Sequence, residues 1–153
     1  MSARLHEFKD GAALAEGLAD RVSAALADAV AARGKATIAV SGGSTPKAFF
    51  KSLSTRDIDW AKVTITLVDE RFVPADNPRS NHLLVAENLL QGKAQAALFL
   101  PLYRQADSAD EAAKIVSRDA DALGAPASRP STRNAVVAPA TIRGARMVSP
   151  WWM

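Results

Sequence analysis

The sequence contains no cysteine, which excludes disulfide bonds, thiolate metal ligands and cysteine nucleophiles and favours a reducing compartment. Long apolar runs are also absent, and none approaches the roughly 20 residues that cross a bilayer. Charged residues interrupt the N-terminus at Arg4, Glu7, Lys9 and Asp10, unlike the apolar centre of a secretory signal. We therefore expect a cytoplasmic protein that does not bind a membrane.

Acidic residues are missing from the last part of the chain. Residues 1–121 contain 15 Lys and Arg and all 16 Asp and Glu, whereas residues 122–153 contain four Arg and no acid. The net charge of +3 and the pI of about 9.5 thus arise in the tail. The body has no basic stripe with interleaved aromatic residues, so we do not expect nucleic-acid binding.

Alternating helical and extended patterns predict an α/β protein with a doubly wound, mostly parallel sheet and helices on both faces. The run VTITLV at 63–68 is nearly all β-branched or apolar, which indicates a strand buried on both faces. Capping residues place several helix ends. The expected elements are an edge strand at 4–8, a helix from Asp10 to about Ala32 ended by Gly34, a strand at 37–40, a helix at 46–53, Trp60 folded onto the core, a strand at 63–68, a helix from Ser80 or Asn81 to about Gln91, a strand at 98–100, and a helix from Asp107 or Ser108 to about Leu123.

The first chemical motif is TIAVSGGSTP, from Thr37 to Pro46. It reads as a strand, a tight glycine turn and a helix start, with Ser44 or Thr45 as the helix cap. Free backbone N–H groups and the helix dipole at such a turn favour an anion. An ordinary strand-to-helix turn would have the same pattern, so this motif alone leaves both interpretations open.

The second motif follows the 63–68 strand as DERFVP and continues into DNPRSN. Ligands of doubly wound sheets bind beyond the carboxyl ends of the strands. Both motifs lie at such ends, the first after the expected strand at 37–40 and the second after the strand at 63–68. Their coincidence predicts one binding site rather than two unrelated turns.

From about residue 124 the composition changes to Pro, Ser, Arg and Ala, and the chain ends on Trp151, Trp152 and Met153. Only Val136-Val137 resembles a strand. The sequence therefore predicts a domain at 1–123 and an irregular basic tail at 124–153.

Together, SGGSTP, VDERFVP and DNPRSN resemble the 6-phosphogluconolactonase family over about residues 4–121. GGSTP is shared with the related glucosamine-6-phosphate isomerases and deaminases. The resemblance implies a doubly wound α/β fold and hydrolysis of 6-phosphogluconolactone to 6-phosphogluconate in the oxidative pentose phosphate pathway. It also implies that neither a metal nor a cofactor is needed, and that the partner is a small sugar phosphate lactone.

The resemblance also assigns residues to the site. Gly42, Gly43, Ser44 and Thr45 would line the sugar-phosphate pocket, and Asp69 and Arg71 would lie at the catalytic centre. Arg79, Ser80 and Asn81 would help to bind the phosphate end of the substrate. For Asp69 and Arg71, the competing interpretation is a structural ion pair at the end of a strand.

One departure from the family pattern is large. Members continue into a Gly-x-Asp-Gly-His-Thr-Ala-Ser-like segment whose His is thought to activate water, and neither this segment nor the last strands and helices of the domain are present here. The only histidines are His6, expected to be structural, and His82, expected to be a partly exposed helix residue. The fold is therefore expected to be truncated at its C-terminal end, and the activity of this chain is in question.

A shift of reading frame near residues 121–130 would explain both the missing segment and the unusual tail. Translation of the downstream DNA in the other two frames tests this hypothesis.

Three alternatives to an active lactonase stay open at this point. They are a sugar-phosphate-binding fragment without catalysis, an isomerase or deaminase, and an incompletely folded product with an exposed strand edge. The sequence leaves the oligomeric state open.

Overall fold

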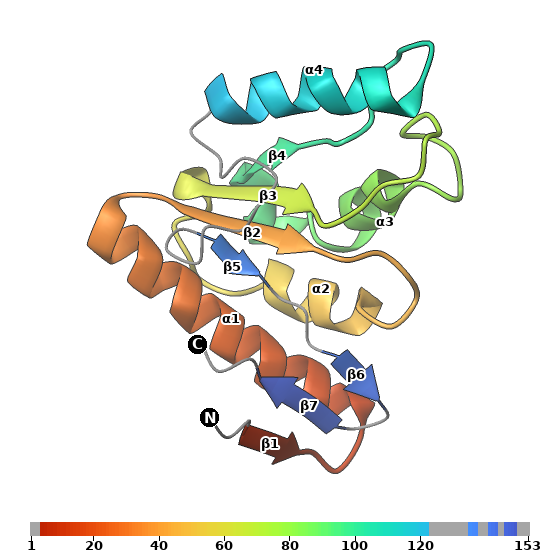
Figure 1. Ribbon diagram of the computed structural model, residues 1–153. Helices are drawn as coiled ribbons and strands as arrows, with labels where there is room; N and C mark the ends of the chain where they lie inside the picture. The colour runs from red at the N-terminus through yellow and green to blue at the C-terminus, as the bar shows by residue number, and fades with distance from the viewer. Residues whose placement is uncertain (1–3, 123–134, 138–140, 144–145, 150–153) are drawn as a thin grey trace.

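The computed structural model describes residues 4–122 and three short strands at 135–137, 141–143 and 146–149. Its centre is a four-stranded parallel sheet with the order β4-β3-β2-β5 (Figure 1). The strands are β2 (Ala36–Val40), β3 (Val63–Leu67), β4 (Leu98–Leu100) and β5 (Ala135–Val137). The prediction of an α/β protein with a parallel sheet is confirmed.

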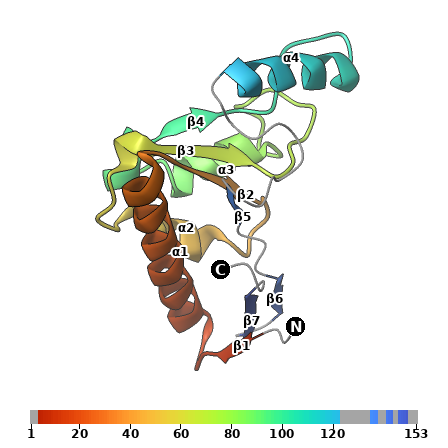
Figure 2. The ribbon, with the colours of Figure 1, turned by 60° about the vertical axis from the view of Figure 1, so that its left-hand side comes forward.

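Helices lie on both sides of this sheet. In Figures 1 and 2, α1 (Gly11–Arg33) and α2 (Lys47–Ser54) lie on one side, and α4 (Ala109–Ala122) lies on the other. The helix α3 (Asn81–Asn88) packs against α2. Two short 3-10 helices, Trp60–Lys62 and Gly92–Ala96, precede β3 and β4.

Several helix ends form where their capping residues predict. Asp10 caps α1, because its Oδ1 accepts a hydrogen bond from the N–H of Ala13 at 2.8 Å. Gly34 ends α1 with a φ of 76° and donates its N–H to the carbonyl of Val30 at 2.7 Å. Ser108 accepts a bond from the N–H of Glu111 at 3.2 Å, just before α4 begins.

Two local predictions are wrong. The first concerns the cap of α2. Pro46 is the N-cap residue, it already has a right-handed helical conformation, and no side chain caps the helix; Ser44 and Thr45 are exposed.

The second concerns β3, which ends at Leu67; Val68 is 54% exposed. Within β3, buried and half-buried residues alternate, because the helices cover one face more completely than the other.

The hydrophobic core lies between the sheet and the helices α1, α2 and α3. Trp60 belongs to it, as predicted, with 3% of its surface exposed. The largest fully buried side chains are Phe50, Leu26, Ile38, Leu53, Ile65, Leu89, Val22, Val40, Val63 and Val85.

No helix in the described part of the chain is long and apolar enough to cross a membrane.

A second, antiparallel sheet has the order β1-β7-β6. It contains β1 (Arg4–Glu7), β6 (Thr141–Arg143) and β7 (Arg146–Ser149). The prediction of an edge strand near residue 4 is confirmed. β6 and β7 differ from the irregular tail that the sequence predicts, because β7 pairs with β1 across most of the chain and local patterns do not encode such pairing. Residues 123–134 lie outside the described residues, so the boundary at 123 stays a prediction.

Candidate functional site

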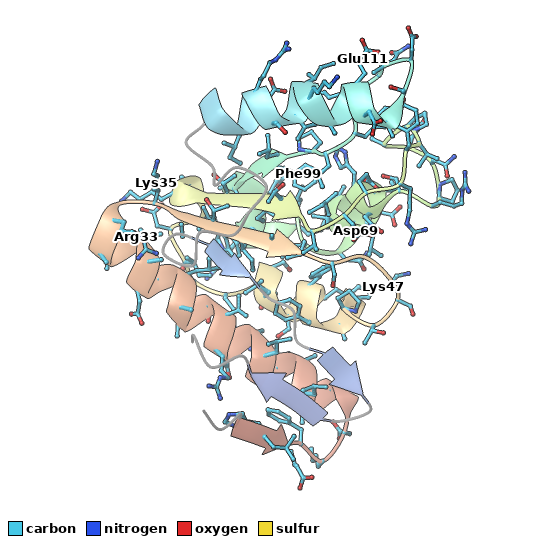
Figure 3. The ribbon with its side chains drawn as sticks, viewed as in Figure 1. Arg33, Lys35, Lys47, Asp69, Phe99 and Glu111 are labelled. Atoms are coloured by element: carbon cyan, nitrogen blue, oxygen red, sulfur yellow. The ribbon has the colours of Figure 1, made fainter. Side chains whose placement is uncertain are left out.

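The two polar motifs lie side by side at the carboxyl edge of the parallel sheet. β2 and β3 are paired in register with Val40 opposite Leu67, and the N–H of Val68 continues the ladder to the carbonyl of Val40 at 2.9 Å. In Figure 3, Asp69 at the end of β3 and Lys47 at the start of α2 mark this edge. The strand order reverses between β2 and β5, which is where doubly wound sheets bind their ligands.

The first turn, residues 41–46, leads from β2 into α2. Gly43 has a φ of 100°, a conformation that side-chain-bearing residues rarely adopt. Gly43, Ser44 and Thr45 are exposed, and within the described structure their N–H groups donate to no protein acceptor. The turn therefore presents open donors at a helix start, which suits an anion such as a phosphate group.

The second loop presents charges of both signs. Asp69, Arg71 and Arg79 are all exposed, and none of them takes part in an ion pair among the residues that the structure describes. The structural ion pair between Asp69 and Arg71 does not form. Their charged groups are open to solvent and to a ligand.

Glu70, between these two residues, points back into the protein. Its carboxylate accepts four hydrogen bonds, from the N–H groups of Arg71 (2.8 Å), Asn81 (2.7 Å) and His82 (2.8 Å) and from Oγ of Ser80 (3.0 Å). Burial raises the pKa of Glu70, but these bonds to the ionised form outweigh it and hold the pKa below its ordinary value. Glu70 is therefore a carboxylate at neutral pH.

Asn81 links the second loop to the first. Its Nδ2 donates to the carbonyl of Asp69 at 3.0 Å, and its side chain is buried. Its amide group occupies the position that a Cβ at residue 42 would take, so only glycine fits at Gly42. The 41–46 turn and the start of α3 are thus locked against each other.

Ser80 and Asn81 use their side chains inside the protein. Ser80 is the N-cap of α3, as predicted, and its Oγ accepts the N–H of His82 at 3.1 Å and of Leu83 at 3.4 Å. The prediction that Ser80 and Asn81 contact the substrate stays a prediction. Their observed bonds show that they hold the loops in place.

Neither histidine stands among the exposed groups of the two loops. The ring of His82 packs on Phe99 with 4.5 Å between centroids, and His82 is half-buried. Burial lowers the pKa of His82, partly offset by the carboxylate of Glu70. His6, in β1, contacts Arg21 of α1, with 2.9 Å between Nε2 and the guanidinium.

Sequence reasoning missed two residues. Glu70 stands in the DER motif, but three of its four donors follow ten to twelve residues later, beyond the reach of local patterns. Lys47 opens α2, is exposed and forms no ion pair within the described residues. A cation at a helix N-terminus interacts unfavourably with the helix dipole, and this unfavourable position could have indicated an anion-binding site nearby.

No group of three or more His, Asp and Glu suitable for a metal ion occurs among the described residues.

The fold and this edge define a doubly wound α/β protein with an anion-suited turn beside a charged loop. The family model for glucosamine-6-phosphate isomerases/6-phosphogluconolactonase matches residues 9–135, and the chain belongs to this family. The chain is 63% identical over 126 residues to a 6-phosphogluconolactonase of Rhizobium meliloti, covering 82% of this chain and 54% of the relative. A 6-phosphogluconolactonase of Mesorhizobium japonicum is 57% identical over 106 residues, covering 69% of this chain and 44% of the relative.

Solved structures agree with this assignment. A 6-phosphogluconolactonase of Shewanella baltica matches with a TM-score of 0.73 and 44% identity, over 74% of this chain and 48% of that one. A monomeric glucosamine-6-phosphate deaminase matches with a TM-score of 0.61 at 18% identity and shows the fold alone. The chain spans about half the length of the curated relatives it matches.

Proposed function

We propose that this chain supplies the sugar-phosphate-binding part of a 6-phosphogluconolactonase, which hydrolyses 6-phosphogluconolactone to 6-phosphogluconate. The main support is the pair of exposed polar loops at the carboxyl edge, which meet where the side chain of Asn81, bonded to the carbonyl of Asp69, lies over Gly42. The names of the relatives supply the substrate class.

The phosphate group fits the positive side of this edge. The free N–H groups of residues 43–45 would bind its oxygens, as helix N-termini do in other phosphate sites. Arg71 and Arg79 each offer a planar fork that can bind two oxygens at once. Lys47 adds a further cation beside the turn.

The sugar end of the substrate would face Asp69. In lactone hydrolysis water adds to the carbonyl carbon, the ring C–O bond breaks, and the ring oxygen takes up a proton. Of the two carboxylates in the DER motif, the oxygens of Glu70 are occupied, whereas Asp69 is exposed and its side chain has no partner in the described structure. Asp69 is therefore the group that can accept a hydrogen bond or a proton from a hydroxyl or water.

Binding without turnover is the second candidate. It is favoured by the position of His82, whose ring lies against Phe99, and by the absence of any further histidine from the sequence apart from His6. A phosphate-binding edge would then be present without an imidazole to activate water.

Two assays on the 153-residue chain separate these candidates. The first follows hydrolysis of freshly prepared 6-phosphogluconolactone, corrected for spontaneous hydrolysis. The second follows binding of the stable product 6-phosphogluconate by calorimetry. Hydrolysis above background supports the lactonase, and binding without hydrolysis supports the second candidate. If a folded chain shows neither hydrolysis nor binding, both candidates are contradicted. Release of ammonia from glucosamine-6-phosphate would instead indicate a deaminase.

A matched pair of arginine variants tests the site itself. Arg71→Ala should weaken binding of 6-phosphogluconate about tenfold, the order expected for one lost charge-assisted contact. Arg33→Ala serves as the control, because Arg33 is exposed at the opposite edge of the sheet (Figure 3). Equal affinities of the two variants would contradict the placement of the phosphate beside Arg71.

A further inference from the structure

One carboxylate connects two segments of the candidate site. Glu70 lies three residues beyond the end of β3 and accepts the N–H of its neighbour Arg71 with the same oxygen, Oε1, that accepts the N–H of Asn81. Its other oxygen, Oε2, accepts the N–H of His82 and Oγ of Ser80. The loop after β3 and the start of α3 are therefore held at a fixed distance by one side chain.

The connection extends to the first turn through Asn81. The N–H of Asn81 is held by Glu70, its Nδ2 by the carbonyl of Asp69, and its amide group lies directly over Gly42. A displacement of Asn81 would therefore reach the backbone on which residues 43–45 present their N–H groups. No other described side chain accepts bonds from both the 69–71 loop and the start of α3.

We propose that Glu70 is a positioning residue, which sets the placement of the 41–46 turn and the 69–71 loop relative to each other and so shapes the sugar-phosphate site. The proposal rests on the function proposed above for that site. Glu70 itself does not touch the ligand, because both of its oxygens are engaged within the protein. Its negative charge at the N-terminus of α3 also occupies the place that a bound phosphate would otherwise take there.

The test compares two identical chemical changes on the chain. Glu70→Gln removes the charge and puts an N–H₂ group where N–H and O–H donors now converge. Glu87→Gln makes the same change on α3, at an exposed residue whose side chain forms no hydrogen bond or ion pair in the described structure. In ¹H–¹⁵N spectra, Glu70→Gln should shift the amide signals of Gly42 and Gly43, and Glu87→Gln should leave them unchanged.

Affinity then separates positioning from mere loss of stability. Val85→Ala leaves a cavity beneath α3 without touching Glu70, since Val85 is fully buried in the core. Glu70→Gln should weaken binding of 6-phosphogluconate about tenfold. Val85→Ala should lower the thermal midpoint and keep the affinity. An equal loss of affinity in Val85→Ala, or unchanged Gly42 and Gly43 signals in Glu70→Gln, would overturn the proposal.

The two proposals fail in different ways. If the wild-type chain does not bind 6-phosphogluconate, the proposed function is wrong, while the amide signals still decide whether Glu70 positions the turn. If Glu70→Gln does not fold, Ser80→Ala takes its place. This variant removes one of the four donors and keeps the charge, so it should shift the same two signals by a smaller amount. Unmoved signals in a folded Ser80→Ala would count against the proposal.

Discussion

The N-termini of α2 and α3 occupy equivalent places and differ in nearly every detail. Both follow a parallel strand at the same edge of the sheet. At α3, Ser80 caps the helix, Glu70 accepts bonds from the first N–H groups, and Ser80 and Asn81 are buried. At α2 no side chain caps the helix and residues 43–45 are exposed.

This difference shows how one topology yields one helix end closed by its own side chains and one that is left open. Each helix N-terminus has unsatisfied donors and a positive dipole. The protein neutralises the α3 end with its own carboxylate and leaves the donors of the α2 end open. That open end is where we propose that the phosphate binds.

The contact that joins the two ends gives the largest expected effect. Gly42→Ala would place a Cβ where the buried amide of Asn81 lies, forcing Asn81 away from Asp69. We expect the free energy of unfolding to fall by about 1–3 kcal/mol, the cost of a buried polar group left without a partner. Urea unfolding measures the change.

A double-mutant cycle isolates this contact. In an Asn81→Ala background the same Gly42→Ala change should cost much less, because the colliding amide is gone. Gly11→Ala is the matched control, since a Cβ at Gly11, the first residue of α1, meets nothing within 4 Å. Costs that simply add in the double mutant would refute the lock between the turns.

The caps give a smaller and more direct contrast. Ser80→Ala removes the side-chain oxygen that accepts the N–H groups of His82 and Leu83, so it should cost about 1 kcal/mol. Thr45→Ala, next to the N-cap of α2, removes no cap and should change stability by less than about 0.5 kcal/mol. Thermal unfolding of both variants measures the difference, and a similar loss in each would show that α2 is capped after all.

Sequence signals identified those parts of the fold that depend on nearby residues. Asp10, Gly34 and Ser80 each satisfy backbone groups within four residues, and the ends they predict are observed. The rule for parallel sheets then placed both motifs at one edge, as the register of β2 and β3 confirms. The sequence could not show whether an available capping residue is used: Thr45 is exposed and does not cap α2.

The remaining features depend on contacts between distant parts of the chain. The role of Glu70 requires the start of α3 to lie beside the end of β3, and the pairing of β7 with β1 spans most of the sequence. Asp69 and Arg71, by contrast, were singled out from their motif alone. The structure leaves both open to a ligand, and their roles stay a prediction until binding is measured.

Acidification should produce the smallest effect, since Glu70 and His82 are both half-buried and partly screened by water. The pKa of His82 is lowered by burial in the folded protein, so folding disfavours its protonated form and stability falls as pH drops below the ordinary value of about 6.5. The pKa of Glu70 is also lowered, so its contribution is complete above about 4.3 and is lost at more acidic pH. Urea unfolding across both windows should show two declines in stability.

Each decline is assigned by one variant. His82→Gln should reduce the decline near neutral pH, and Glu70→Gln should reduce the one at acidic pH, because each removes a group that takes up a proton. Part of the acidic decline should remain, because hydrogen bonds from Ser52 and Arg56 also lower the pKa of Glu16. The acidic decline is the decisive part of the comparison, since it reports the carboxylate that closes the α3 end and has no counterpart at α2. If the acidic decline in Glu70→Gln is as large as in the wild type, Glu70 does not close α3 as a charged group, and the contrast between the two helix ends would have to arise from Ser80 alone.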